Sequence, residues 1–284
     1  MIHPKQLHPR RHVFQGHATG VSAHIRRPEK HLLESKGSSA LPPTGGHFTS
    51  SDGPKSLGKW VSYQSVETSA YGDYADAEQG RKTTLGEVAF DAAPVVTRIS
   101  SRVQGLDILG RLRIADLSLG MVSRSAQDSS QPSIQLENNR IDGVTIDGSK
   151  LKIDLAEGFY SQHDTKDKLQ AAHDKGLPEQ HARMFLPCKV GEEEVKSFPE
   201  ANGAVKCTIV QNVSWDGAPH SDAQIHGHVV VVPGFGKIYF GEMSISADTR
   251  RLTLVRCQLG SDDGGEVSAG DGQTNGQTFP PTGG

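Results

Sequence analysis

Cysteine, aromatic residues and net charge are all scarce in this chain of 284 residues. Three cysteines without a Cys-x-x-Cys pair are too few for a disulfide scaffold and give no zinc-ligand spacing. Aromatic residues make up 6% and the net charge is -3, which argues against a nucleic-acid-binding surface. The longest apolar run, Val229 to Val232, is far too short to cross a bilayer, which takes about 20 apolar residues.

Two of the cysteines, Cys188 and Cys207, lie in β-like runs on either side of the polar stretch GEEEVKSFPEANG. If these runs pair as a hairpin, the two thiols face each other and can form a disulfide. The alternative is that both are small buried residues of the core. The sequence leaves both interpretations open.

Short β-like runs punctuated by glycine follow one another through most of the chain. The stretch LDILGRLRIADLSLGMVS alternates strongly, with phase shifts near Gly110 and Asp116 that indicate a bulge or a turn. No alternation of strands with helices and no repeat of fixed period is visible. The sequence therefore predicts an all-β fold, a β-sandwich or distorted barrel of about twelve strands with one short inserted helix.

The helix is predicted from the stretch HDTKDKLQAAHDKG, which is rich in helix-forming residues. Asp164 is the expected N-cap, and Gly176 stands where a helix commonly ends. The following PEQHARMF can continue the helix, so residues 163–183 form the predicted helical insertion.

We expect a flexible basic arm over residues 1–11, one β-rich domain over residues 12–270 and a flexible tail over residues 271–284. Within the domain, residues 26–59 are rich in proline, glycine and serine, which predicts a loop with room for one short strand at His31 to Leu33. The motif PPTGG occurs once in this loop and once at the chain end. The loop copy reads as a sortase signal, but no apolar segment follows either copy, so both are interpreted as strand stops.

Histidines in HSDAQIHGH are the sharpest metal candidates. Alternate residues of a strand share a face, so His226 and His228 could reach one divalent ion, with His220, Asp222 or Glu242 as the third ligand. The β-rich cupins use a similar His-x-His strand, but their downstream glutamate and histidine are missing here. The alternative is a solvent-facing histidine pair opposite a buried face.

The stretch DGQTNG near the C-terminus is typical of the start of a calcium loop, with oxygen-bearing side chains at alternate positions. Asp271, Gln273 and Asn275 are the candidate ligands. The acid expected at the twelfth position falls on Thr282, so the motif is incomplete. A solvated loop without calcium is the alternative.

No serine-nucleophile elbow, Walker loop or HExxH motif is present. Acidic residues gather in the middle strands and leave a glycosidase-like carboxylate pair open, namely Asp107, Asp116, Glu137, Asp142 and Asp147. The lack of catalytic signatures favours a protein that is not an enzyme and has no cofactor.

Several stretches, in order and spacing, resemble the bacterial surface and secreted β-proteins known as choice-of-anchor P: FQGHATGVSAHI, SALPPTGG, SAYGDYADA, VVVPGFGKIYFGEMSI and RRLTLVRCQLG. The resemblance covers roughly residues 12–270. It implies an extracellular β-rich domain and no particular reaction. No export signal is visible in the chain, so a cytoplasmic location stays open.

Two function hypotheses follow. The first is a non-enzymatic surface or secreted structural or binding protein, which associates with itself by donating strands from its polar termini. It involves no nucleic acid and no membrane span. The second is a cupin-like, metal-dependent small-molecule enzyme that uses the His-x-His strand.

Overall fold

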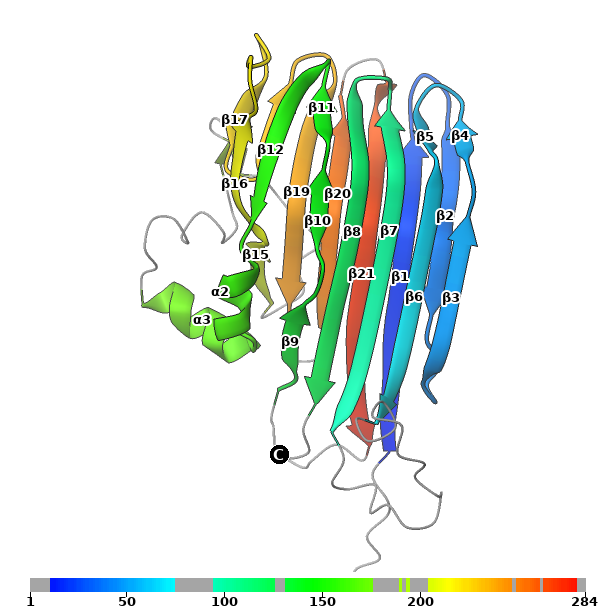
Figure 1. Ribbon diagram of the computed structural model, residues 1–284, viewed down its shortest axis with the longest axis vertical. Coiled ribbons are helices and arrows are strands. Elements are labelled where there is room, and N and C mark those ends of the chain that lie inside the picture. Colours follow the sequence, from blue (N-terminus) through cyan, green and yellow to red (C-terminus); the bar gives the residue numbers. More distant parts are fainter. Residues whose placement is uncertain are drawn as a thin grey trace, which may run out of the picture.

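A computed structural model of the protein describes residues 11–74, 94–125, 131–175, 189–190, 193–194, 204–246, 249–260 and 263–279. Two antiparallel sheets of long strands pack face to face, which makes the fold an all-β sandwich (Figure 1). The predicted fold class is confirmed. Among the described residues, no helix is long and apolar enough to span a membrane.

One sheet contains both ends of the described chain. Its eight described strands are β1 (Arg11–Ile25), β2 (His31–Ala40), β15 (Val205–Thr208), β17 (Gln224–His226), β18 (Val229–Val232), β19 (Gly236–Ile245), β20 (Thr249–Leu259) and β21 (Gly265–Phe279). They run in the order β17-β18-β19-β20-β21-β1-β2, and β15 pairs with β19.

The other sheet holds the middle of the chain. Its eleven described strands are β3 (Gly46–Asp52), β4 (Lys55–Leu57), β5 (Val61–Tyr63), β6 (Ser65–Tyr74), β7 (Val95–Ile108), β8 (Leu112–Ser125), β9 (Ser133–Leu136), β10 (Arg140–Asp142), β11 (Val144–Ile146), β12 (Ser149–Leu155) and β16 (Val210–Trp215). The order is β16-β12-β11-β8-β7-β5-β4, with β9 and β10 on β8, β6 on β7, and β3 on β6. A separate short pair joins β13 (Lys189–Val190) to β14 (Glu193–Glu194). The number of described strands is larger than the predicted twelve, because turns and irregularities divide long β-like stretches of the sequence into several strands.

The core lies between the two sheets, where β1 and β21 face β6, β7 and β8. Ile99 and Leu119 are fully buried here. A Cβ atom at Gly272 would collide with the side chain of Ile99 and lie 3.0 Å from Leu119 Cδ2. The sheets can therefore approach this closely only because β21 carries glycine at this position.

The predicted irregularity in the stretch LDILGRLRIADLSLGMVS is confirmed. A turn that includes Gly110 (φ 68°) joins β7 to β8. Beyond it, Leu106 pairs with Ile114 and Gln104 with Asp116, which leaves one residue on each strand outside the ladder. One of them is Gly105, which has a left-handed φ of 61°. The register of β7 with β8 is the same on both sides of this break, so it is a local irregularity of both strands and not a bulge with an extra residue on one of them.

The prediction of a loop over residues 26–59 is wrong, because β2, β3 and β4 lie within this range. The short strand allowed at His31 to Leu33 is the start of the longer β2. Both β2 and β3 lie at the margins of their sheets, and they expose half and most of their residues, respectively. Few positions have to be apolar in such strands, so the sequence looks like a loop. Their ladders with β1 and β6 hold them in place.

The prediction of a flexible tail over residues 271–284 is also wrong for residues 271–279, because β21 extends to Phe279. β21 pairs along its whole length with β1, and also with β20, so it lies inside the sheet. Backbone hydrogen bonds to both neighbours hold β21 in the sheet, although its polar side chains do not predict a strand. Residues 11–25 and 265–279 pair with each other and are not available as donor strands, whereas residues 1–10 and 280–284 lie outside the described chain.

The described chain has two helices, α2 (Glu157–Gln162) and α3 (Lys166–Asp174), which lie beside β9 and β15 at one side of the sandwich (Figure 1). The helical insertion was predicted over residues 163–183, so its start is confirmed at α3, whereas α2 was missed and residues 176–183 are outside the described chain. Thr165, not Asp164, caps α3, because its Oγ1 accepts the backbone N–H of Lys168 at 3.3 Å. Asp164 instead accepts a bond from Lys168 Nζ at 2.6 Å.

The first PPTGG motif acts as a strand stop, as predicted. β2 ends at Ala40 and β3 begins at Gly46. Between them, the backbone N–H of Gly45 donates to the Pro42 carbonyl at 2.9 Å and closes a tight turn. The second copy follows the last residue of β21 and lies outside the described chain.

Candidate functional site

The predicted histidine pair is divided by a hairpin turn. His226 is the last residue of β17, and Gly227, with a φ of 60°, and His228 form the two-residue turn into β18. The two histidines therefore do not lie side by side on one face of a strand, as the metal prediction required. The sequence signal for this outcome is Gly227, because glycine readily takes the left-handed conformation that such a turn needs.

The third predicted ligand, His220, belongs to a different cluster. Its Nε2 lies 3.1 Å from Asp147 Oδ2, and Asp147 also accepts a 2.6 Å bond from Arg111 Nη2. These contacts, the Arg111 bond first, lower the pKa of Asp147. Within the described ranges, no group of three histidine, cysteine or acidic side chains is placed to hold a metal ion.

Glu242, the alternative third ligand, is fully buried and bound to arginine. Arg256 donates from Nε and Nη2 to its two oxygens at 2.7 and 3.0 Å. The guanidinium also stacks on Tyr239, 3.8 Å from the ring centroid. This geometry satisfies both carboxylate oxygens, so Glu242 has a structural partner already.

The predicted calcium ligands lie on β21 and not in a loop. Asp271 accepts bonds from Arg251 Nη2 at 3.0 Å and from Thr253 Oγ1 at 2.9 Å. Gln273 and Asn275 follow along the same straight strand. A calcium loop curls its oxygens around one ion, whereas a strand spreads them along a line.

The predicted disulfide cannot be placed, because Cys188 lies outside the described chain, and it stays a prediction. Its expected partner, Cys207, is fully buried on β15, and burial raises the pKa of its thiol to about 12. This environment suits an unreactive core residue.

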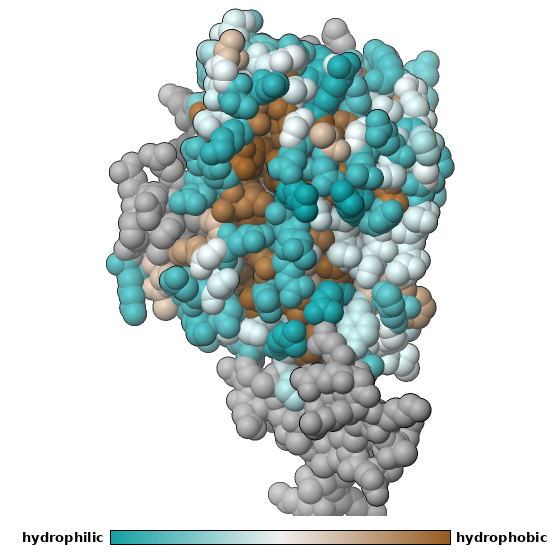
Figure 2. Space-filling model, viewed as in Figure 1, coloured by the Kyte–Doolittle hydropathy of each residue, from teal (hydrophilic) through white to brown (hydrophobic). Residues whose placement is uncertain are grey.

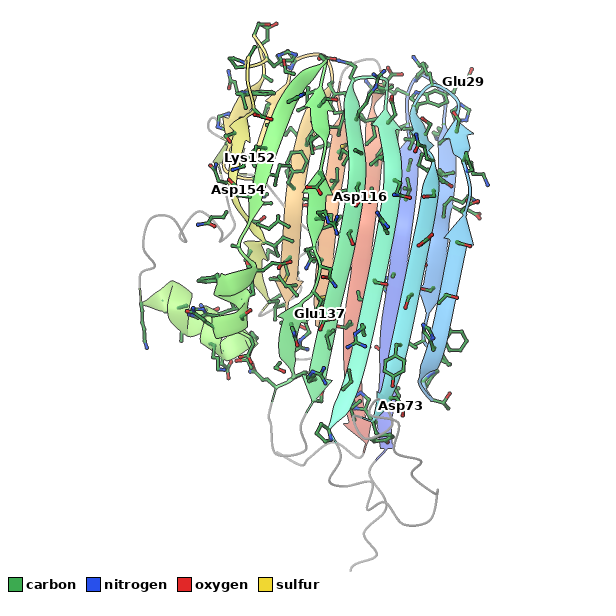
Figure 3. All side chains as sticks on the ribbon, in the orientation of Figure 1. Glu29, Asp73, Asp116, Glu137, Lys152 and Asp154 are labelled. Carbon is green, nitrogen blue, oxygen red and sulfur yellow. The ribbon has the colours of Figure 1, made fainter. Side chains whose placement is uncertain are left out.

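The acidic residues of the middle strands are paired with arginines. Figure 3 labels two of them, Asp116 and Glu137, on the outer side of the eleven-stranded sheet. The pairs are Asp107–Arg113 at 2.9 Å, Asp116–Arg102 at 2.8 Å, Glu137–Arg98 at 3.5 Å, Asp142–Arg140 at 3.8 Å and Asp147–Arg111 at 2.6 Å. This pairing argues against a glycosidase-like pair among them, because a nucleophile and an acid need separate, adjusted environments.

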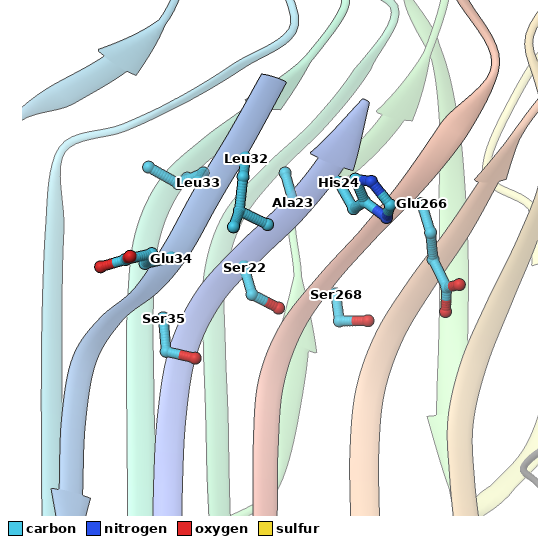
Figure 4. A pocket seen from close by; sticks show the side chains of 9 residues that line it. All are labelled: Ser22, Ala23, His24, Leu32, Leu33, Glu34, Ser35, Glu266 and Ser268. Carbon is cyan, nitrogen blue, oxygen red and sulfur yellow. The ribbon is translucent and has the colours of Figure 1, made fainter. Parts of the chain in front are cut away.

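One groove, of about 410 Å³, lies on the outer face of the eight-stranded sheet (Figure 4). We name it the β1–β2 groove, and its lining is Ser22, Ala23, His24, Leu32, Leu33, Glu34, Ser35, Glu266 and Ser268. It opens where the register of β1 and β2 shifts between Val21 and Ala23. His24 and Glu266 are neighbours across β1 and β21.

A second groove, of about 480 Å³, lies on the outer face of the eleven-stranded sheet. We name it the hydroxyl groove, because eight of its ten lining residues are serine or threonine: Thr49, Ser50, Ser51, Glu67, Thr68, Ser69, Ser100, Ser101, Arg102 and Ser118. Hydrophilic and intermediate residues cover this part of the molecule, over β6 and β7 in Figure 2. Hydrophobic atoms show instead near β10 and β12.

Strand register aligns the outward side chains of the hydroxyl groove in two rows. The first row is Thr49, Ser69 and Ser100. The second is Ser51, Glu67, Arg102 and Ser118. Neighbours within a row are about 4.8 Å apart. Ser101, by contrast, points into the sandwich and donates to the Thr19 carbonyl at 3.2 Å.

This groove was not predicted from the sequence. Its signal is at least one serine or threonine on each of four strands, such as Thr49 and Ser51 on β3 and Ser118 on β8. The strands are far apart in the sequence, so the rows exist only once the register is known.

The fold is an all-β sandwich with one groove on the outer face of each of its two large sheets. A family model described as a domain of unknown function (DUF8256) matches residues 12–246, and the chain belongs to this family. The match ends after β19, although β20 and β21 complete the same sheet. No curated protein and no solved structure shows significant similarity to the chain. The resemblance to choice-of-anchor P proteins therefore stays a prediction.

Proposed function

We propose that this protein is a non-enzymatic binding protein that holds a neutral polysaccharide chain in the hydroxyl groove. The observation that carries the proposal is the alignment of two polar rows across β3, β6, β7 and β8, the first made of three hydroxyls and the second of two hydroxyls on either side of Glu67 and Arg102. In agreement with the resemblance above, we place the protein at the cell surface or in the secreted fraction.

The chemistry of the rows fits sugar hydroxyls. A serine or threonine hydroxyl both donates and accepts hydrogen bonds, as a sugar hydroxyl does. Glu67 adds an acceptor and Arg102 adds donors in the second row. Because Asp116 accepts two bonds from Arg102, at 2.8 and 3.3 Å, the guanidinium charge is already compensated. A neutral ligand is therefore a better fit than an anionic one.

An aromatic pair extends the groove at one end. His47 and Tyr71 form the next outward row on β3 and β6, with ring centroids 6.2 Å apart. Ring faces of this kind pack against the apolar face of a sugar ring. The groove is shallow and runs across several strands, which suits an extended chain better than a small enclosed molecule.

Titration calorimetry with cellohexaose, laminarihexaose and chitohexaose tests the proposal. The double variant Ser69→Ala/Ser100→Ala removes two hydroxyls from the first row. Each lost hydrogen bond costs about 0.5–1.5 kcal/mol, so the affinity should fall about 5- to 150-fold.

The matched control is Ser22→Ala/Ser268→Ala, which removes two hydroxyls from the β1–β2 groove and should leave the affinity unchanged. The proposal fails if none of the three oligosaccharides binds. It also fails if the control variant, and not the groove variant, weakens binding.

A further inference from the structure

The strand β3 forms an open edge of the eleven-stranded sheet. It pairs with β6 on one side, in unbroken register from Gly46 opposite Gly72 to Asp52 opposite Val66. In the described part of the chain, no strand pairs with its other side. Figure 1 shows β3 at the margin of the sandwich, and five of its seven residues are exposed. The edge can therefore accept another strand.

This edge lacks the features that usually protect an edge strand. Natural edges carry lysine, proline or a bulge, which prevent pairing with another chain. The neighbouring strand β4 follows this rule, because Pro54 precedes it and Lys55 begins it. The seven residues of β3, GHFTSSD, contain neither lysine nor proline.

An exposed aromatic side chain lies in the middle of the same strand. Phe48 is 43% exposed, and only Leu32 is also a strongly exposed large apolar residue within the described ranges. Phe48 is on the opposite face of β3 from Thr49, so it does not belong to the hydroxyl groove.

We propose that β3 binds β3 of a second copy of this chain, antiparallel and about a twofold axis at Thr49. In this register Gly46 lies opposite Asp52, His47 opposite Ser51, and Phe48 opposite Ser50. No like charges face each other directly. The two Phe48 side chains are diagonal neighbours, about 7–8 Å apart between strands, which is within reach of aromatic rings.

The pairing joins the eleven-stranded sheets of two copies into one continuous sheet. The contact is isologous, so it closes at a dimer. The first hydroxyl row would then continue from Thr49 of one copy to Thr49 of the other. Dimerisation itself does not depend on polysaccharide binding, and the two can be tested apart.

Light scattering of the full chain, coupled to size exclusion over a hundredfold range of concentration, is the first test. We expect a monomer–dimer equilibrium. Phe48→Lys removes the aromatic contact and adds like charges near the axis, so it should give a monomer. Ser56→Lys adds the same charge on β4, which lies outside the proposed contact, and this variant should dimerise as the parent does. A parent that is monomeric at every concentration overturns the proposal, as does equal dimerisation of both variants.

Cysteine cross-linking tests the register. Thr49→Cys places a thiol directly opposite its copy, within the distance that a disulfide spans, and should give a reducible covalent dimer under mild oxidation. Ser56→Cys and the parent chain are the controls, because they show how much cross-linking comes from the three cysteines that the parent chain already contains. Cross-linking of Ser56→Cys or of the parent to the same extent as Thr49→Cys contradicts the register.

Discussion

The buried His228 should make the stability of the protein depend on pH below neutrality. Its side chain is 1% exposed, and its two ring nitrogens have no hydrogen-bond partner in the part of the chain that the structure describes. Burial, and secondarily the charge of Arg256, lowers the pKa of His228 to about 4. In the unfolded chain the pKa of a histidine is about 6.5.

The sign follows from this difference. As the pH falls below 6.5, His228 binds a proton in the unfolded chain, whereas in the folded chain it stays neutral down to about pH 4. The stability that is present above pH 6.5 is therefore lost as the pH falls from 6.5 to 4. For these two pKa values, the linkage relation gives a loss of about 2 kcal/mol between pH 7 and pH 5.

The variant His228→Leu should not show this loss. Urea unfolding at pH 7 and pH 5, followed by tryptophan fluorescence, measures the free energy of unfolding for both proteins. The parent should lose about 2 kcal/mol more than the variant. His12 also has a pKa lowered to about 4 by burial, so His12→Leu should flatten the remaining slope. If the parent and His228→Leu lose the same stability, the reasoning about His228 is refuted.

Three further predictions concern the packing of the sandwich, and urea unfolding measures each. Arg256→Met should lower the free energy of unfolding by about 3–5 kcal/mol, because it leaves Glu242 buried without a cation. The double variant Arg256→Met/Glu242→Leu should recover most of this stability, and a double variant as unstable as Arg256→Met would contradict the explanation. Gly272→Val should lower the free energy of unfolding by about 1–3 kcal/mol, because the new side chain collides with Ile99. Gly158→Ala, with open space around it in α2, should raise the free energy of unfolding by about 0.5–1 kcal/mol. A stabilising Gly272→Val or a destabilising Gly158→Ala would contradict this reasoning. Deleting residues 271–284 should abolish folding, since β21 lies between β1 and β20, and a folded truncated chain would show that the ladder is dispensable.

The sequence predicted those parts of the fold in which side chains alternate strongly. β7 and β8 are central strands with one buried face, so their apolar residues repeat every two positions, and even the irregularity near Asp116 is visible as a shift in phase. β3 and most of β2 were missed because edge strands bury little. The part of β21 after Gly270 was missed because glycine and threonine replace large apolar residues where the sheets approach closely.

The candidate site was harder to predict than the fold. The spacing of His226 and His228 predicted a shared strand face, but the turn at Gly227 separates them. The hydroxyl groove has no local motif, because Ser69 and Ser100 become neighbours only through the pairing of β6 with β7. Local patterns predict strands, whereas a surface site of this kind depends on which strands pair and in what register.

The central claim is that the hydroxyl groove is the binding surface. The most direct test is a ¹H–¹⁵N NMR titration with the hexasaccharide that binds most tightly in calorimetry. We predict that the amide signals of Ser69, Ser100 and Arg102 shift first and saturate together. Shifts confined to Ser22 and Ser268 of the β1–β2 groove would contradict the claim.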